Sequence, residues 1–238
     1  MCLIVFAWKL IPACPLVLAA NRDEFFERPT QAASWWDDAP HVYAGRDLQA
    51  GGTWLGTDKR GRFAALTNIR NGSVQRAEAR SRGELVADFL RGDLSAKDYL
   101  QKLKTSAGDY NGFNLLLGDT NAAYWFSNHA GSPEQSLEPG IYGLSNGALD
   151  TPWPKVLRAK AQFASLLCQG APDDAYFEML ADTTQASDVR LPDTGVSLEW
   201  ERRLSPIYIE SPDYGTRASS LLRIHASGNS QLVEKVIR

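Results

Sequence analysis

Residues 1–24 read MCLIVFAWKLIPACPLVLAANRDE, and this stretch decides the fold. Two apolar runs, residues 2–8 and 16–20, flank Pro12 and Pro15. Short runs of this kind around a proline turn predict an antiparallel strand pair that is buried on both faces. The polar residues 21–24 then end the second strand, so Arg22 and Asp23 are expected to lie near Cys2.

Cys2 follows the initiator directly, and its small side chain should allow Met1 to be removed. One residue would then carry both a thiol and a free α-amine. The unperturbed pKa values of these groups are ~8.5 and ~8, so near neutral pH part of the amine is uncharged and can accept the thiol proton. A nucleophile with its own base is the arrangement of enzymes with N-terminal nucleophiles.

The composition is that of an ordinary soluble protein, with 44% hydrophobic and 22% charged residues among 238. We find no linker and expect one domain over residues 1–238. The net charge of −3 argues against a general attraction to nucleic acid or to anionic membranes. Basic residues do cluster at 59–62 and 70–82, which indicates either a solvated loop or a patch for an anionic ligand.

The three cysteines, Cys2, Cys14 and Cys168, are too few and too scattered for a disulfide framework or a zinc site. The three histidines are far apart in sequence, so we predict no metal site. Residues 1–20 lack the basic start of a secretory signal, and no stretch of about 18 apolar residues predicts a membrane span. We therefore expect a cytoplasmic protein without stable membrane insertion.

Beyond the first strand pair, residues 25–51 contain two prolines and a Trp-Trp-Asp-Asp cluster, which predicts a long irregular connection that covers a site. A second hairpin is expected to end at Asn68. The remaining predicted elements are helices over 85–90, 95–103, 154–168 and 173–180, and strands over 112–117, 122–127, 141–144, 214–224 and 232–237. Hairpins with helices grouped between them favour an α+β layered domain.

Four polar residues recur near the ends of these strands: Asp23, Asn68 and Asn146, and, near a strand start, Arg217. Attack of a thiolate on an amide or ester places negative charge on the carbonyl oxygen, and side-chain amides can donate hydrogen bonds to it without titrating. Asp23 could orient the amine, and Arg22 or Arg217 could bind an anionic substrate group. The simpler interpretation of each residue alone is a turn contact.

Nearly the whole chain, from Met1 to about Leu222, resembles the NRDE family, also called the transport-and-Golgi-organisation family. The resemblance is carried by the segments MCLIVFAW, AANRDEFFERPT, GGTWLG, ALTNIR, SRGELVADFL, GFNLLLGD, YGLSNGALDTPWPKV and YGTRASSLL. It implies an N-terminal-nucleophile hydrolase-like fold, which is a four-layer αββα sandwich with two stacked antiparallel sheets.

A fainter resemblance links the chain to choloylglycine hydrolases and acid-ceramidase-like amidases. It implies Cys2 as nucleophile, Asp23 as the aspartate of an Arg-Asn-x-Asp segment, and Asn68 and Asn146 as oxyanion donors. The chain departs from that segment at Ala20, which replaces the arginine. Arg22 is nearby, and we expect it on the opposite face of the strand.

Two hypotheses follow. The first is an N-terminal cysteine hydrolase that cleaves a non-peptide amide, ester or thioester bond of a small acyl substrate, without a cofactor. The second is a non-catalytic trafficking protein that binds haem or another tetrapyrrole, or an acyl-coenzyme A or lipid, as the family resemblance implies. The candidate binding residues are Asn21, Arg22, Trp54 and Arg217. The sequence predicts no oligomeric state.

Overall fold

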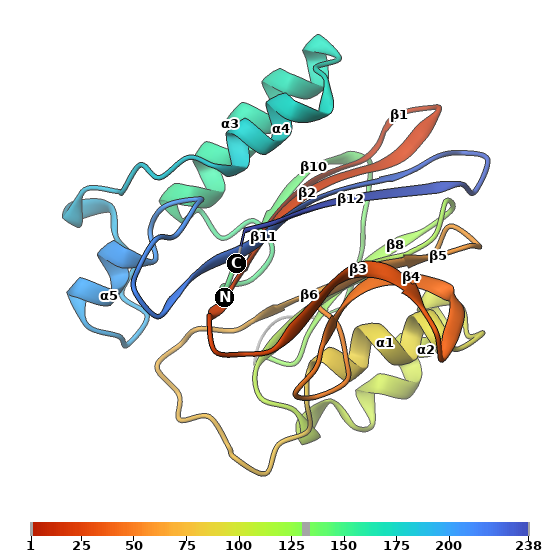
Figure 1. Ribbon diagram of the computed structural model, residues 1–238, viewed down its shortest axis with the longest axis horizontal. Helices are drawn as coiled ribbons and strands as arrows, with labels where there is room; N and C mark the ends of the chain where they lie inside the picture. The colour runs from red at the N-terminus through yellow and green to blue at the C-terminus, as the bar shows by residue number, and fades with distance from the viewer. Residues whose placement is uncertain (1, 130–133, 238) are drawn as a thin grey trace.

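The computed structural model describes residues 2–129 and 134–237, and in it two antiparallel sheets are stacked between two layers of helices (Figure 1). Helices α3 (Pro154–Gln169) and α4 (Asp173–Leu180) cover the outer face of one sheet. Helices α1 (Gly83–Arg91) and α2 (Ala96–Lys104) cover the other sheet. The predicted αββα order of layers is confirmed.

The first sheet has five strands and is built around the predicted hairpin. In spatial order its strands are β10 (Gly140–Leu144), β1 (Cys2–Ile11), β2 (Cys14–Phe25), β11 (Tyr214–Ile224) and β12 (Ser230–Val236). The register between β1 and β2 pairs Cys2 with Arg22 and Ile4 with Ala20. The tetrad at residues 21–24 therefore returns to the start of the chain, as predicted.

The second sheet has seven strands in sequence order, and it corrects one prediction. Its strands are β3 (Thr30–Trp36), β4 (Ala39–Asp47), β5 (Leu55–Asp58), β6 (Phe63–Asn68), β7 (Phe113–Gly118), β8 (Ala123–Ser127) and β9 (Gln135–Ser136). Residues 25–51 are therefore not an irregular connection, because most of them form β3 and β4. Pro40 is exposed near the start of β4, where it does not interrupt the burial of Val42 and Ala44.

Local signals explain where the helices begin and end. The Ser95 side chain caps α2 by accepting a hydrogen bond from the backbone N–H of Asp98 at 3.1 Å. Helix α3 begins with Pro154 and ends before Gly170, whose φ of 60° suits a left-handed C-cap. The short helix α5 (Leu198–Arg203) was not predicted. No helix within residues 2–129 and 134–237 has the length and apolar character needed to cross a membrane.

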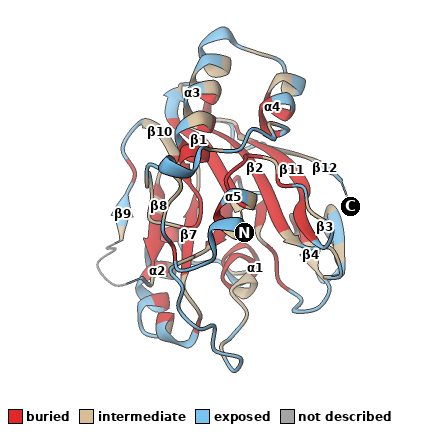
Figure 2. Cartoon of the chain, turned by 90° about the vertical axis from the view of Figure 1, so that its left-hand side faces the viewer, coloured by how far each residue is buried: buried red, intermediate tan, exposed pale blue. Residues whose placement is uncertain are grey.

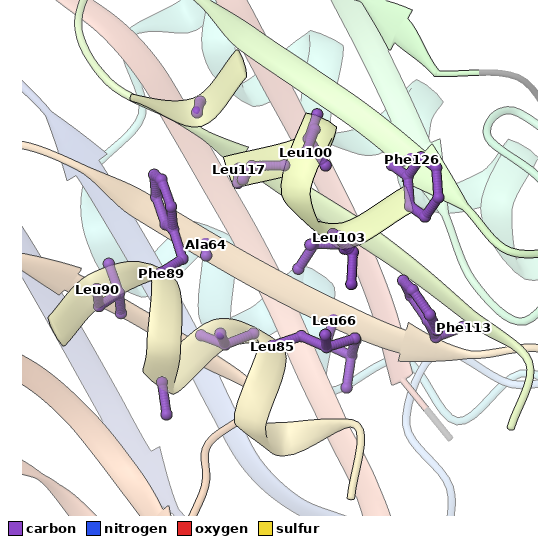
Figure 3. Packing of buried hydrophobic residues seen from close by; sticks show 14 of the residues in the cluster. Ala64, Leu66, Leu85, Phe89, Leu90, Leu100, Leu103, Phe113, Leu117 and Phe126 are labelled. Carbon is purple, nitrogen blue, oxygen red and sulfur yellow. The ribbon is translucent and has the colours of Figure 1, made fainter. Parts of the chain in front are cut away.

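Three apolar clusters hold the layers together, and buried residues follow the strands of both sheets (Figure 2). Between the sheets lie alternate residues of β1, such as Phe6 and Trp8, while Leu3 and Val5 face α3 and α4. Below the second sheet, side chains of α1 and α2 pack against β6 and β7 (Figure 3). The hairpin β1–β2 is thus buried on both faces, as its continuous apolar runs predict.

Candidate active site

A polar pocket of about 400 Å³ lies where the two sheets meet, and both sheets contribute to its walls. Cys2, Arg22 and Asp23 come from the first sheet, while Leu66 and Asn68 come from β6 of the second. The remaining lining residues are Glu24, Arg28, Asp47, Gln49, Ala50, Thr53, Trp54, Arg76, Ala77, Ala79, Arg80, Ser81, Arg82, Gly83 and Asn111. The pocket therefore contains three of the four residues predicted to be catalytic.

A close backbone contact shapes one wall of this pocket. Gly52 lies against Gly83, and the backbone N–H of Thr53 donates a hydrogen bond to the Gly83 carbonyl at 3.1 Å. A Cβ atom at Gly52 would come within 2.4 Å of the Gly83 backbone. Only a residue without a side chain allows this approach, which brings the start of α1 to the pocket.

Cys2 is the first residue of β1 and is partly buried at the pocket. Burial raises the pKa of its thiol, while the backbone N–H of Asp23 and the charge of Arg22 favour the thiolate. Because burial dominates, the thiol needs a base to become nucleophilic near neutral pH. The predicted removal of Met1 concerns a residue outside the described part of the chain.

Asp23 is buried beside Cys2 and is held by β11. Its Oδ1 accepts a hydrogen bond from the Thr216 hydroxyl at 2.8 Å, and the Tyr214 hydroxyl donates to its backbone carbonyl at 3.2 Å. Burial raises the pKa of the Asp23 carboxyl, and the positive charge of Lys155 opposes that shift. Lys155 was not among the residues singled out from the sequence.

The two candidate oxyanion donors are joined to one another. The Asn146 side-chain amide donates to the backbone carbonyl of Asn68 at 2.8 Å, and Ser145 donates to the Cys2 carbonyl at 3.0 Å. Asn146 is fully buried behind the pocket, whereas Asn68 lines it. Among the described residues, the side-chain amide of Asn68 has no hydrogen-bond partner, so it is available to a ligand.

Arg22 faces the pocket, which corrects the prediction that it lies on the opposite face of the strand. It stacks on Trp54, with 4.2 Å between its guanidinium carbon and the ring centroid. Residues two apart on a strand share a face, so Arg22 and Ala20 point the same way and both lie beside Cys2. Arg22 is 5% exposed and its Nη1 has no hydrogen-bond partner within the described residues.

The other two candidate binding residues do not line the pocket. Arg217 lines a neighbouring cavity of about 90 Å³ that Arg22 and Trp54 also border, and it donates to the carbonyls of Phe25 and Arg28. Burial lowers the pKa of Arg217.

Asn21 is fully buried and its side chain makes three hydrogen bonds. Its amide nitrogen donates to the carbonyls of Leu180 and Ile207 at 2.8 and 2.9 Å, and its oxygen accepts from Ser219 at 2.7 Å. Its side chain therefore anchors β2 to the end of α4 and to the segment before β11.

The contacts of Asn21 predict a structural role. Asn21→Ala leaves several buried polar groups unpaired, so we expect the free energy of unfolding to fall by about 3 kcal/mol. Urea unfolding followed by circular dichroism measures the change. Exposed Asn71→Ala is the matched control and should change stability by less than about 0.5 kcal/mol. Equal effects of the two substitutions would contradict this role.

Arginines give the pocket its charge, and most of them come from the basic segment at residues 70–82. Arg28 pairs with Asp47 at 2.6 Å, and Arg80 pairs with Glu84 at 2.6 Å. Arg76 and Arg82 donate instead to uncharged groups, namely backbone carbonyls and, for Arg82, the Gln75 side chain. With Arg22, three pocket arginines thus have no carboxylate partner within the described residues.

The basic cluster at residues 59–62 has a different role. Arg60 and Arg62 both pair with the buried Asp58, at 2.9 and 2.8 Å, and Lys59 lies over the Trp35 ring.

Within residues 2–129 and 134–237, no group of three or more His, Cys, Asp or Glu side chains is arranged to hold a metal ion. Among the described residues that line the pocket, Cys2 alone has a thiol or imidazole that could ligate haem iron.

Comparison with known sequences gives matches over the whole chain. The family model described as "Transport and Golgi organisation 2" matches residues 1–238. The "Transport and Golgi organization protein 2 homolog" of Bos taurus is 37% identical over 256 residues, covering 99% of this chain and 92% of the relative. The Homo sapiens homolog is 35% identical, with the same coverage.

Comparison with solved structures confirms the fold class. A mutant of the conjugated bile acid hydrolase from Clostridium perfringens has a TM-score of 0.55 at 9% identity, covering 100% of this chain and 92% of that one. The Caenorhabditis elegans N-acylethanolamine-hydrolyzing acid amidase ortholog has a TM-score of 0.55 at 8% identity, covering 92% of each chain. At these identities the likeness establishes the N-terminal-nucleophile hydrolase fold and no more.

Proposed function

The chain belongs to the Transport and Golgi organisation 2 family, and from this premise we propose that it hydrolyses a non-peptide amide, ester or thioester bond of a small acyl substrate, with Cys2 as the nucleophile. The observation that carries the proposal is the position of Cys2. It begins β1 at a pocket of about 400 Å³, beside Asn68, whose side-chain amide is available to a ligand. The fold shared with amide-hydrolysing enzymes supports it.

The proposed reaction has two steps. After Met1 is removed, the α-amine of Cys2 accepts the thiol proton, and the thiolate attacks the substrate carbonyl carbon. The bond to the leaving amine, alcohol or thiol breaks, the leaving group takes the proton from the α-ammonium, and an acyl thioester remains on Cys2. Water, deprotonated by the same amine, then attacks this thioester and releases the carboxylic acid and the free thiol.

The surrounding residues support this chemistry in different ways. Asn68 is placed to donate to the oxyanion, and Asn146, which is buried behind the pocket, donates to the Asn68 carbonyl and so holds this donor in position. The Asp23 carboxylate, fixed by Thr216, orients the amine. The proposed hydrolysis therefore depends on the correct pairing of β1, β2, β6 and β10, because these strands place the residues named above.

The charge of the pocket narrows the class of substrate. Arg22, Arg76 and Arg82 line the pocket without carboxylate partners among the described residues, and planar guanidinium groups bind phosphate and carboxylate groups well. We therefore expect the substrate to carry an anionic group. A phosphate-bearing acyl thioester, such as an acyl-coenzyme A, combines that charge with a bond that Cys2 can cleave.

Intact mass of the purified protein tests the proposal directly. The mass first shows whether Cys2 is the N-terminal residue. Brief exposure to a panel of acyl amides and acyl-coenzyme A thioesters, followed by acid quench, is expected to add the mass of the acyl group, located on Cys2 by peptide mapping. Neither adduct formation nor release of free acid with any member of the panel would contradict the hydrolase.

A non-catalytic binding function is the second candidate, and the five pocket arginines favour it. The same pocket would hold an acyl-coenzyme A or lipid, or haem, as cargo. Its lining is mostly polar and charged, which suits a phosphate-bearing ligand better than the apolar face of a tetrapyrrole.

Titration of haem and of a non-hydrolysable acyl-coenzyme A analogue measures this second function. Saturable binding that Arg22→Ala weakens at least about tenfold, together with no acyl transfer from the acyl-coenzyme A thioesters to Cys2 in the mass experiment, would favour a carrier. Lys97→Ala, a change on the exposed side of α2, is the control. Absence of saturable binding of either ligand would remove the carrier hypothesis.

A further inference from the structure

Arg22 differs from the other arginines of the pocket because it lies directly beside the nucleophile. The ladder between β1 and β2 pairs Cys2 with Arg22, so their side chains are cross-strand neighbours on one face of the sheet. Arg76 and Arg82 line the pocket from the segment that leads into α1. The pocket thus has one cation next to the thiol and two on a separate segment of the chain.

The guanidinium group of Arg22 has unused hydrogen-bonding capacity. Arg22 is 5% exposed and lies over the Trp54 ring, and its Nη1 has no hydrogen-bond partner within residues 2–129 and 134–237. The N–H donors of a guanidinium lie in its plane, so contact of its face with an aromatic ring leaves them able to bind a carboxylate. A buried charged donor without a partner is costly, which favours a ligand that supplies one.

Two carboxylates border the same spaces as Arg22, and neither forms an ion pair with it in the described part of the chain. Glu234 and Arg22 both line the cavity of about 90 Å³, but the Glu234 Oε1 accepts a hydrogen bond from the Ala33 backbone at 2.7 Å. Glu24 lines the pocket, and its Oε1 accepts from the Phe25 backbone at 2.9 Å. The Arg22 guanidinium is therefore available to the carboxylate of a ligand.

A mostly apolar wall joins Cys2 to Arg22. Both residues border a cavity of about 10 Å³, whose other lining residues are Ile4, Ala20, Asn21, Trp54, Leu55, Leu66 and Ser220. The apolar members come from both sheets, since Ile4 belongs to β1 and Leu66 to β6. Methylene groups suit such a wall, whereas a phosphate group would lose its hydration there. The space is small, so only a short chain fits between the thiol and the guanidinium.

We propose that the acyl group cleaved at Cys2 is short and ends in a carboxylate, which binds the Arg22 guanidinium. The inference rests on the proposed hydrolase and names its substrate class, a thioester of a dicarboxylic acid, with the phosphates of the leaving thiol on Arg76 and Arg82. The bond from the acyl carbon to the leaving sulfur breaks as the bond to the Cys2 Sγ forms. Water then releases the dicarboxylate, whose far end Arg22 has held throughout.

Glutaryl- and pentanoyl-coenzyme A provide the test, because their acyl groups have the same number of carbon atoms and only the first ends in a carboxylate. Each is supplied to the wild-type protein, and the rate without protein is subtracted. We expect kcat/KM for the glutaryl thioester to be at least about tenfold higher, since only this substrate makes the charge-assisted pair with Arg22. A smaller ratio would overturn the inference.

Two substitutions separate the acyl end of the substrate from its thiol end. Arg22→Met keeps a long side chain without the charge and should bring the ratio of the two kcat/KM values to within about threefold of unity. Arg82→Met removes a cation assigned to the coenzyme phosphates, so it should raise KM for both thioesters alike and leave their ratio unchanged. A folded Arg22→Met protein that keeps the wild-type ratio would contradict the role of Arg22.

Protection of Cys2 tests the same site without turnover. Alkylation by iodoacetamide, followed by peptide mass mapping, is measured with glutarate or pentanoate present, and exposed Cys168 reports reagent reactivity in the same sample. Glutarate should slow the alkylation of Cys2 saturably and at lower concentration than pentanoate, and Arg22→Met should remove this difference.

The protection measurement also separates the two proposals. If no thioester acylates Cys2, the hydrolase is rejected, and protection alone decides whether this carboxylate site exists. Equal protection by the two acids, or none by either, would then overturn it. If Arg22→Met does not fold, the wild-type preference and the wild-type protection decide in the same way.

Discussion

Cys2→Ala is expected to lower the turnover of any substrate that acylates the wild-type protein by at least about 10³-fold, because no other group replaces the nucleophile. The loss should appear in kcat, since the pocket residues that bind the substrate remain in place. Steady-state release of the free acid measures turnover. Intact mass should show no acyl adduct on the variant.

Cys168→Ala is the control for this substitution. Cys168 is exposed near the end of α3 and is not a pocket residue, so its replacement should leave kcat and the adduct unchanged. Circular dichroism should show that both variants are folded. Turnover by Cys2→Ala within tenfold of the wild type would show that the reaction does not use this thiol.

Glu201→Ala is expected to lower the free energy of unfolding by about 3–5 kcal/mol, because it breaks a buried ion pair from one side. The Arg70 and Glu201 side chains are only 9% and 4% exposed. Without the carboxylate, Arg70 and Lys155 become neighbouring buried cations, and the hydrogen bonds that Glu201 accepts from Thr194 are lost. Urea unfolding at pH 7 measures the change.

Glu199→Ala on the same helix provides the comparison. Glu199 pairs with Arg203 at 3.3 Å, but its side chain is 78% exposed, so its loss should cost less than about 1 kcal/mol. The double variant Arg70→Met/Glu201→Met removes both buried charges and should recover much of the lost stability. A Glu201→Ala effect no larger than that of Glu199→Ala would refute the proposed importance of this pair.

The sequence predicts the hairpin β1–β2 well because its signals are local. Two continuous apolar runs, a proline turn between them and a polar end fix the strands, and the register brings Arg22 opposite Cys2. The strands β3 and β4 are different. These two strands form one edge of the seven-stranded sheet. The prolines and polar residues around Trp36 are as typical of a loop as of a strand.

The candidate site was predictable only in part. Cys2, Asp23 and Asn68 follow from position and residue type, because each lies at the end of a strand in one pair of hairpins. Lys155 does not, since a lysine after the first proline of a helix normally projects into solvent. Its burial depends on the packing of α3 against the rest of the molecule, which the local sequence does not encode.

Arg22 illustrates a second limit. Its side chain is long, so even with the correct strand register its final position depends on Trp54, which approaches from the other sheet. The arginines of residues 70–82 form a recognisable basic cluster in the sequence. The contacts in the folded protein decide which of these arginines lack acidic partners.

The pocket is assembled from two separate sheets, with the thiol on one and Asn68 on the other. Its geometry therefore tests how accurately the sheets are docked. A slight loosening of the apolar layer between the sheets would move the Cys2 thiol away from the Asn68 amide, while the strands of each hairpin stayed paired. The reactivity of Cys2 at this interface should consequently be lost at lower denaturant concentrations than the far-ultraviolet circular dichroism signal of the strands. Its loss would be the first measurable sign that the packing between the sheets has weakened.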